Sequence, residues 1–208
     1  VGYGGIILYY LVVYGIKDPV YWMGMLAVIF LGLMFVYVFS FPKFRAEQVM
    51  TTFFCAFYAP VLFTFIFLTR NLPNGIYMVW MIFISAYLSG MAIGKHKLAP
   101  VLSPKKSIEG AVGGVVGAGL VGALFGWLVL ERVFADQNIT WIAAVICAAA
   151  GMISQVGDLA ASAIKRNQGI KDYGKLIPGH GGIMDRFDSV LFTAPIIYYL
   201  AILLIRFD

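Results

Sequence analysis

The chain has 208 residues, of which 62% are hydrophobic and only 12% are charged. A typical soluble domain is about 45–50% apolar and about 25% charged, so a soluble globule of this length could not bury so much apolar surface. These proportions exclude a disordered chain, a disulfide scaffold and a soluble Rossmann-type enzyme, and they predict an integral membrane protein. The net charge of +5 indicates orientation and anionic lipid in such a protein, rather than a nucleic-acid partner.

Seven apolar stretches follow one another along the chain. Most of them reach the length of about 20 helical residues that crosses a bilayer core of about 30 Å. They are continuous rather than alternating, which argues against membrane strands. We therefore predict an all-α fold, a polytopic transmembrane helix bundle with about seven or more spans. The stretches cover residues 4–16, 19–41, 51–69, 76–94, 111–130, 139–161 and 189–205.

Basic residues are distributed unevenly between these stretches, and three connections hold eleven of the 15 Lys and Arg residues. With seven spans, these three connections lie on one side, which the positive-inside pattern identifies as the cytoplasm. No organelle-targeting segment is visible, so a bacterial inner membrane is the expected location. The eleven residues are Lys43, Arg45, Lys95, Lys97, Lys105, Lys106, Lys165, Arg166, Lys171, Lys175 and Arg186.

Small residues mark the stretch that begins at Ala111. Gly113 and Gly117, and again Gly122 and Gly126, are four residues apart, a spacing that lets another helix approach closely. Tight helix packing is the expected role, and space for a lipid chain or a hinge is the alternative. The two cysteines, at positions 55 and 147, lie inside apolar runs and are predicted to be free thiols.

Most of the polar side chains lie in residues 94–114 and 154–189. On a helix, Asp158, Ser162 and Lys165 share one face. Asp185 and Asp188, three residues apart, share a face at the start of the last helix. Capping of that helix is an alternative role for one of these two carboxylates, but it does not account for Asp158.

Three carboxylates, several cations and a glycine-rich turn predict a site for a triphosphate. Mg²⁺ takes carboxylate and phosphate oxygens as ligands, and Lys and Arg neutralise charge that develops on phosphoryl oxygens. The turn at 178–182 (PGHGG) allows close approach of phosphate to backbone N–H groups. The residues alone therefore indicate metal-dependent phosphoryl or nucleotidyl transfer in a polar pocket that faces the cytoplasm.

Residues 162–188 read SAIKRNQGIKDYGKLIPGHGGIMDRFD. This run of 27 positions resembles, without a departure, the signature of phosphatidate cytidylyltransferases, which are CDP-diacylglycerol synthases. The upstream segments GKHKLAP and SPKKSIEG are also similar to that family. We therefore divide the chain by motif content into an N-terminal multi-span membrane region, 1–93, and a C-terminal membrane region, 94–208, that carries the catalytic signature.

The resemblance implies a membrane enzyme of phospholipid biosynthesis that converts CTP and phosphatidic acid to CDP-diacylglycerol and pyrophosphate. It implies Mg²⁺ as the cofactor, and a second cation is the alternative that stays open. It also implies that the protein is a homodimer and that membrane lipids surround it. Asp158 and Asp185 are the implied metal ligands, with Asp188 as the third. The implied catalytic set is Asp158, Lys165, Arg166, Lys171, His180, Asp185 and Asp188. The implied substrate-binding set is Lys105, Lys106, Ser162, Asp172, Gly181, Gly182 and Arg186.

Several of these residues have a structural alternative. His180 is expected to bond phosphate or to be a turn residue held by its neighbours. Ser162 is expected to bond phosphate or metal-bound water, or to pack between helices. Arg186 is expected to bind phosphate or to pair with Asp188. Glu109 is predicted to cap the helix that follows it.

One departure from the family pattern lies upstream of the signature. The family has an acid followed by Ser or Thr shortly before Ala86-Tyr87, whereas this chain has Phe83-Ile84-Ser85 there. Two other functions also stay open, a CTP-dependent polyprenol or phytol kinase and a non-catalytic lipid transporter. The kinase would release CDP rather than pyrophosphate, and the transporter would turn over no nucleotide.

Overall fold

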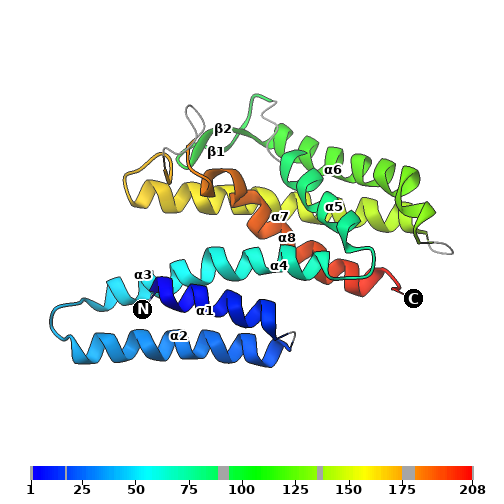
Figure 1. The fold of residues 1–208 in the computed structure, drawn as a ribbon. Coiled ribbons are helices and arrows are strands. Elements are labelled where there is room, and N and C mark those ends of the chain that lie inside the picture. Colours follow the sequence, from blue (N-terminus) through cyan, green and yellow to red (C-terminus); the bar gives the residue numbers. More distant parts are fainter. Residues whose placement is uncertain (1, 17, 89–93, 135–137, 175–180, 208) are drawn as a thin grey trace. The chain divides into compact units, whose positions relative to one another are not determined.

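The computed structural model of the chain describes residues 2–16, 18–88, 94–134, 138–174 and 181–207. Most of these residues are helical, and the described strands form one short hairpin (Figure 1). The predicted all-α class is therefore confirmed. The chain forms two compact units, Val1–Thr64 and Phe65–Asp208. These units follow packing, whereas the division at residue 93 follows motif content and stays a prediction.

The first unit is built from apolar helices with little polar chemistry. Its elements are α1 (Gly2–Gly15), α2 (Pro19–Phe39), α3 (Ala46–Ala56), a π-helical turn (Phe57–Val61) and the start of α4 (Leu62–Arg70). Pro60 lies inside the π-helical turn, where its ring prevents a regular helical hydrogen bond. The Pro60 carbonyl accepts hydrogen bonds from two side chains, Tyr10 Oη at 2.9 Å and Thr64 Oγ1 at 3.0 Å.

The second unit contains both polar segments of the sequence. Its core is formed mainly by apolar side chains of three helices, among them Met81, Ile146 and Leu191, all fully buried. Ser107 is the N-cap of α6 (Ile108–Leu128), and its hydroxyl oxygen accepts from the Gly110 N–H at 3.2 Å. The remaining elements are α5 (Gly75–Leu88), β1 (Lys97–Ala99), β2 (Ser103–Ser107), α6 (Ile108–Leu128), a 3₁₀ turn (Leu130–Arg132), α7 (Ile139–Asn167) and α8 (Met184–Leu204).

Each of the seven apolar stretches corresponds to helix, but the helices differ in length. Five helical segments of the described chain are long and apolar enough to cross a membrane. Two apolar helices are shorter, Gly2–Gly15 and Gly75–Leu88. The protein is thus a helical membrane protein, and the number of spans stays a prediction.

The glycines of α6 bring this helix close to α7. A Cβ at Gly122 would lie 2.6 Å from the Cβ of Cys147, and one at Gly126 would lie 2.8 Å from the Cα of Thr140. Tight packing is therefore confirmed at these two positions. In contrast, a Cβ built at Gly113 or Gly117 would have no atom of another described element within 4 Å, so these two glycines do not contribute to this contact.

We expect Gly122→Ala to destabilise the protein by about 1–3 kcal/mol, because the added methyl group has no space against Cys147. Gly117→Ala is the matched control in the same helix. It should be neutral or stabilising by up to about 1 kcal/mol, since alanine is the better helix former. Thermal unfolding in detergent measures both variants. Equal unfolding temperatures for the two would contradict this account of the contact between α6 and α7.

Candidate active site

A cavity of about 790 Å³ lies within the second unit, between α5, α7 and α8. Its lining comes from mostly apolar side chains at the end of α5 and from mostly polar side chains of α7 and the start of α8. The described lining residues are Phe83, Ala86, Tyr87, Leu88, Asp158, Asp185, Arg186, Asp188, Ser189 and Val190. The structure therefore brings all three predicted metal-ligand carboxylates to one cavity.

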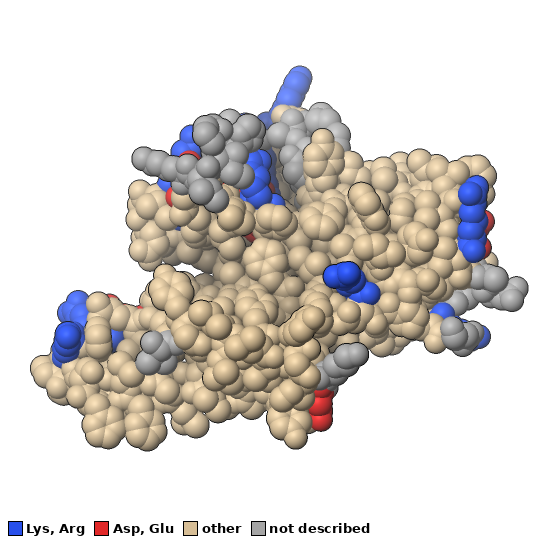
Figure 2. All heavy atoms as spheres, in the orientation of Figure 1, with Lys and Arg blue, Asp and Glu red and all other residues tan. Residues whose placement is uncertain are grey.

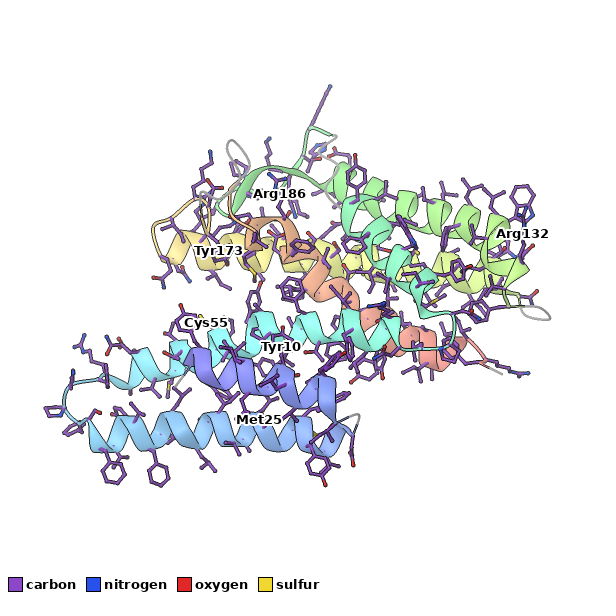
Figure 3. All side chains as sticks on the ribbon, in the orientation of Figure 1. Tyr10, Met25, Cys55, Arg132, Tyr173 and Arg186 are labelled. Carbon is purple, nitrogen blue, oxygen red and sulfur yellow. The ribbon has the colours of Figure 1, made fainter. Side chains whose placement is uncertain are left out.

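The cavity belongs to the end of the second unit that carries the β1–β2 hairpin. Tyr173 and Arg186 lie at this end, and Arg132 lies at the opposite end of the same unit (Figure 3). Basic side chains gather over the hairpin, whereas the visible surface of α6 between its ends shows no charged residue (Figure 2). A charged end beside an uncharged helical flank fits a site at the membrane boundary.

Asp185, in the first turn of α8, is hydrogen-bonded through both carboxylate oxygens. Its Oδ1 accepts from Lys165 Nζ at 2.8 Å. Its Oδ2 accepts from the backbone N–H groups of Tyr173, at 2.8 Å, and of Gly182, at 2.9 Å. The side chains of Lys165 and Asp185 are only 12% and 8% exposed. This one carboxylate therefore joins the end of α7, the segment that follows it and the start of α8.

The side chain of Tyr173 also contacts α7 and Lys165, the partner of Asp185. Its hydroxyl donates to the carbonyl of Ala161 in α7 at 3.2 Å. Its ring centroid lies 5.2 Å from Lys165 Nζ, a distance at which the ring face attracts an ammonium group. Tyr173 therefore helps to fix the position of Lys165 as well as that of Asp185.

Two glycines make the turn before α8 possible. Gly181 has a φ of +81°, which a residue with a side chain rarely adopts. A Cβ at Gly182 would lie 2.8 Å from the backbone nitrogen of Gly174. The Gly182 N–H donates to Asp185, so the observed role of Gly182 is to close this turn.

Asp158 pairs with a lysine from the hairpin. Lys106 Nζ lies 2.5 Å from Asp158 Oδ2, and the two side chains are 16% and 30% exposed. Lys106 Nζ also donates to the carbonyl of Gln155 at 3.5 Å. The side-chain amide of Gln155 in turn donates to the carbonyl of Ala111 at 2.8 Å, which ties α7 to the first turns of α6.

Asp188 is buried one helical turn beyond Asp185. Its side chain lines the cavity, and the residue is 7% exposed. Its Oδ1 accepts from the backbone N–H of Ser189 at 2.6 Å. Asp158 and Asp188 thus line the same cavity, and a cation between or beside two such carboxylates would stabilise them together.

Six other predicted residues are not among the described lining residues of the cavity. Arg166, Lys171 and Asp172 are exposed, and Ser162 is half-buried on α7; none of the four is among the described lining residues. His180 lies outside the described residues, as does the side chain of Lys105. The roles of all six in substrate binding stay predictions.

The structure also identifies residues that the sequence did not single out, namely Tyr173, Gln155 and Ser189. Tyr173 lies inside the signature, so its position there was the available signal. Gln155 is a buried amide in an apolar helix, and such a group requires a hydrogen-bonding partner. Ser85, in place of the expected acid-containing pair, is fully buried in the helical core and lies outside the cavity lining.

Comparison with known proteins identifies the family of the chain. The model of the cytidylyltransferase family matches residues 3–204. The chain belongs to this family. It is 43% identical over 126 residues to a phosphatidate cytidylyltransferase of Staphylococcus saprophyticus, a match that covers 60% of this chain and 46% of the relative.

Two further relatives with the same name give similar values. The Synechocystis protein is 42% identical over 143 residues, covering 65% of this chain and 47% of its own length. The Staphylococcus aureus protein is 39% identical over 154 residues, covering 70% of this chain and 56% of its own. This member of the cytidylyltransferase family thus spans about half the length of the curated relatives it matches.

Proposed function

We propose that the protein transfers the cytidylyl group of CTP to phosphatidic acid and so forms CDP-diacylglycerol and pyrophosphate. The observation that supports this most is the cavity at the charged end of the second unit. Asp185 and Asp188 of the signature and Asp158 just before it line this one space, and two lysines pair with two of these carboxylates. The relatives named phosphatidate cytidylyltransferase supply the substrate class.

In this reaction a phosphate oxygen of the lipid attacks the α-phosphorus of CTP. A new P–O bond forms, the bond between the α-phosphorus and its bridging oxygen breaks, and pyrophosphate leaves with that oxygen. A phosphomonoester is already anionic near neutral pH, so no strong general base is required. Catalysis then depends on positioning and on neutralisation of phosphoryl charge.

The cations around the cavity would supply that neutralisation. Lys106 and Lys165 are held at Asp158 and Asp185 respectively, and Arg186 lines the cavity itself. Pre-positioned cations act strongly in a partly buried site because little solvent reorganises around them. The exposed Arg166 and Lys171 would extend this basic surface toward the triphosphate or the lipid headgroup.

Mg²⁺ fits the donor chemistry of this cavity, since carboxylate oxygens are its preferred protein ligands. We propose Asp158 and Asp185 as its ligands, with Asp188 as the third. No group of three or more His, Cys, Asp or Glu side chains in the described residues is already arranged to hold a metal ion. Lysines pair with two of the carboxylates instead. When bound, Mg²⁺ would stabilise charge on the transferred phosphoryl group.

The membrane setting follows from the distribution of charge. We propose that the cavity opens to the cytoplasm of a bacterial inner membrane, because with seven spans the positive-inside pattern of the basic connections favours that side. The lipid phosphate would then lie where charged side chains meet the bilayer surface, while the acyl chains stay in lipid. A homodimer stays a prediction of the family resemblance.

The test is an assay of both products. Purified protein in detergent is incubated with labelled CTP, phosphatidic acid and Mg²⁺, and CDP-diacylglycerol and pyrophosphate are measured together. We expect both products in equal amounts, and only when the lipid is present. CDP as the coproduct would instead indicate a lipid kinase. Absence of nucleotide turnover in a folded protein would favour a lipid transporter.

A further inference from the structure

A cluster of hydrogen bonds outside the cavity joins the segment before β1 to the first turn of α6. His96 Nδ1 lies 2.5 Å from Glu109 Oε1, and the backbone N–H of His96 donates to Glu109 Oε2 at 3.2 Å. The carbonyl of His96 accepts from the Ile108 N–H at 2.9 Å. His96 is thus bonded through its ring, its N–H and its carbonyl.

Gly94 permits this close approach. Its φ is +136°, and a Cβ at this position would lie 2.4 Å from Glu109 Oε2. Any side chain here would therefore collide with the carboxylate. The backbone before β1 is shaped to bring His96 onto Glu109.

Glu109 lies in the first turn of α6, and its capping role stays a prediction. Ser107 Oγ also caps this helix, since it accepts from the Gly110 N–H. The Glu109 carboxylate in addition reaches His96, 13 residues earlier in the chain. Its observed contact therefore fixes the hairpin to the helix, beyond what the start of the helix needs.

Lys106 lies on the strand next to the two contacts described above, that of Glu109 with His96 and that of Ser107 with the Gly110 N–H. It precedes Ser107, which pairs with Lys97 across the hairpin, and its ammonium group reaches Asp158 in α7. The His96 and Glu109 side chains are 80% and 43% exposed, whereas that of Lys106 is 16% exposed. A contact near the surface thus lies at the end of the strand whose lysine reaches Asp158, a residue of the cavity wall.

We propose that Glu109 is a positioning residue that holds Lys106 against Asp158 through His96 and the β1–β2 hairpin. The effect of Glu109 on turnover rests on the proposed function. Its effect on the position of Lys106 does not. The competing explanation is that Glu109 only stabilises the start of α6 through its negative charge.

Glu109→Asp separates these two explanations. Aspartate keeps the charge in the first turn of α6, but its side chain is one methylene shorter and cannot keep both contacts with His96. Glu109→Ala removes charge and contact together. Glu131→Gln is the matched control, because Glu131 also accepts one side-chain hydrogen bond, from Thr140 Oγ1 at 2.6 Å, and lies beyond the opposite end of α6.

The readout is the rate at which acetic anhydride acetylates Lys106 in the intact protein in detergent, followed by mass spectrometry. Lys165 is the internal reference, since it is similarly shielded and is bonded to Asp185 rather than to the hairpin. We expect the acetylation rate of Lys106 to rise about two- to tenfold in both Glu109→Asp and Glu109→Ala. This range corresponds to the free energy of one lost hydrogen-bonded contact. Lys165 should keep its rate, and Glu131→Gln should change neither lysine.

An unchanged Lys106 rate in Glu109→Asp, or an equal rise at Lys165, would overturn the proposal. Turnover gives the second measurement. Glu109→Asp should lower CDP-diacylglycerol formation in the wild-type background and add no further loss in a Lys106→Met background, because the two residues act as one unit. Independent losses would contradict the proposal. If the wild-type protein forms no product, the proposed function fails, while the acetylation rates still decide the role of Glu109.

Discussion

Asp185→Asn is expected to reduce CDP-diacylglycerol formation by at least about 10²-fold, because it removes a metal-ligand candidate together with the anchor of Lys165. Asparagine has nearly the same shape, but it loses the negative charge and one of the two acceptor oxygens. Lys165 Nζ would then be a shielded ammonium without its ion-pair partner. Breaking one half of such a pair costs about 3–5 kcal/mol, so the unfolding temperature should fall as well.

A double variant separates the effect on stability from the effect on catalysis. Asp185→Asn combined with Lys165→Met leaves no unpaired charge, so most of the lost stability should return. Activity should not return, since both groups that we propose to face the substrate are gone. Asp172→Asn is the control in the same signature, because Asp172 is exposed, and it should unfold like the wild-type protein. Full activity in Asp185→Asn would refute its place in the site.

The helices could be predicted from sequence because each depends on local properties. Continuous apolar runs specify membrane helices almost independently of their partners, and every predicted stretch corresponds to helix in the structure. The short spacing between Gly122 and Gly126 likewise indicated a close helix contact. The i, i+4 relation of Asp158 and Ser162 also holds, since both lie on α7.

The partners of the polar residues could not be predicted in the same way. Lys106 reaches Asp158 across 52 positions of sequence, and Glu109 reaches His96 only because a short hairpin folds back onto α6. Neither pairing follows from periodicity or local propensity. The signature likewise predicted that Asp185 belongs to the site, but its bonds to Tyr173 and Gly182 depend on the path of the turn before α8.

Asp188→Asn is expected to lower activity without lowering stability, unlike Asp185→Asn, which should lower both. The residue is buried and lines the same cavity as Asp158, and burial of a carboxylate that shares a site with a like charge costs free energy. Removing that charge should therefore leave the unfolding temperature unchanged or raise it. Product formation should nonetheless fall by at least about 10²-fold, because the cavity loses a ligand that we propose for Mg²⁺.

Two measurements on Asp188→Asn distinguish a site residue from a structural one. Thermal unfolding in detergent gives the change in stability, and a Mg²⁺ titration of the residual activity gives the metal requirement, which should shift to higher concentration. Ser189→Ala is the matched control, since it removes the hydroxyl 3.4 Å from Asp188 Oδ1 but keeps the backbone N–H bond. A marked fall in unfolding temperature for Asp188→Asn, with an unchanged Mg²⁺ requirement, would show that Asp188 stabilises the fold rather than the reaction. A stable but inactive protein would instead show that the cavity keeps an unfavourable pair of charges for its chemistry.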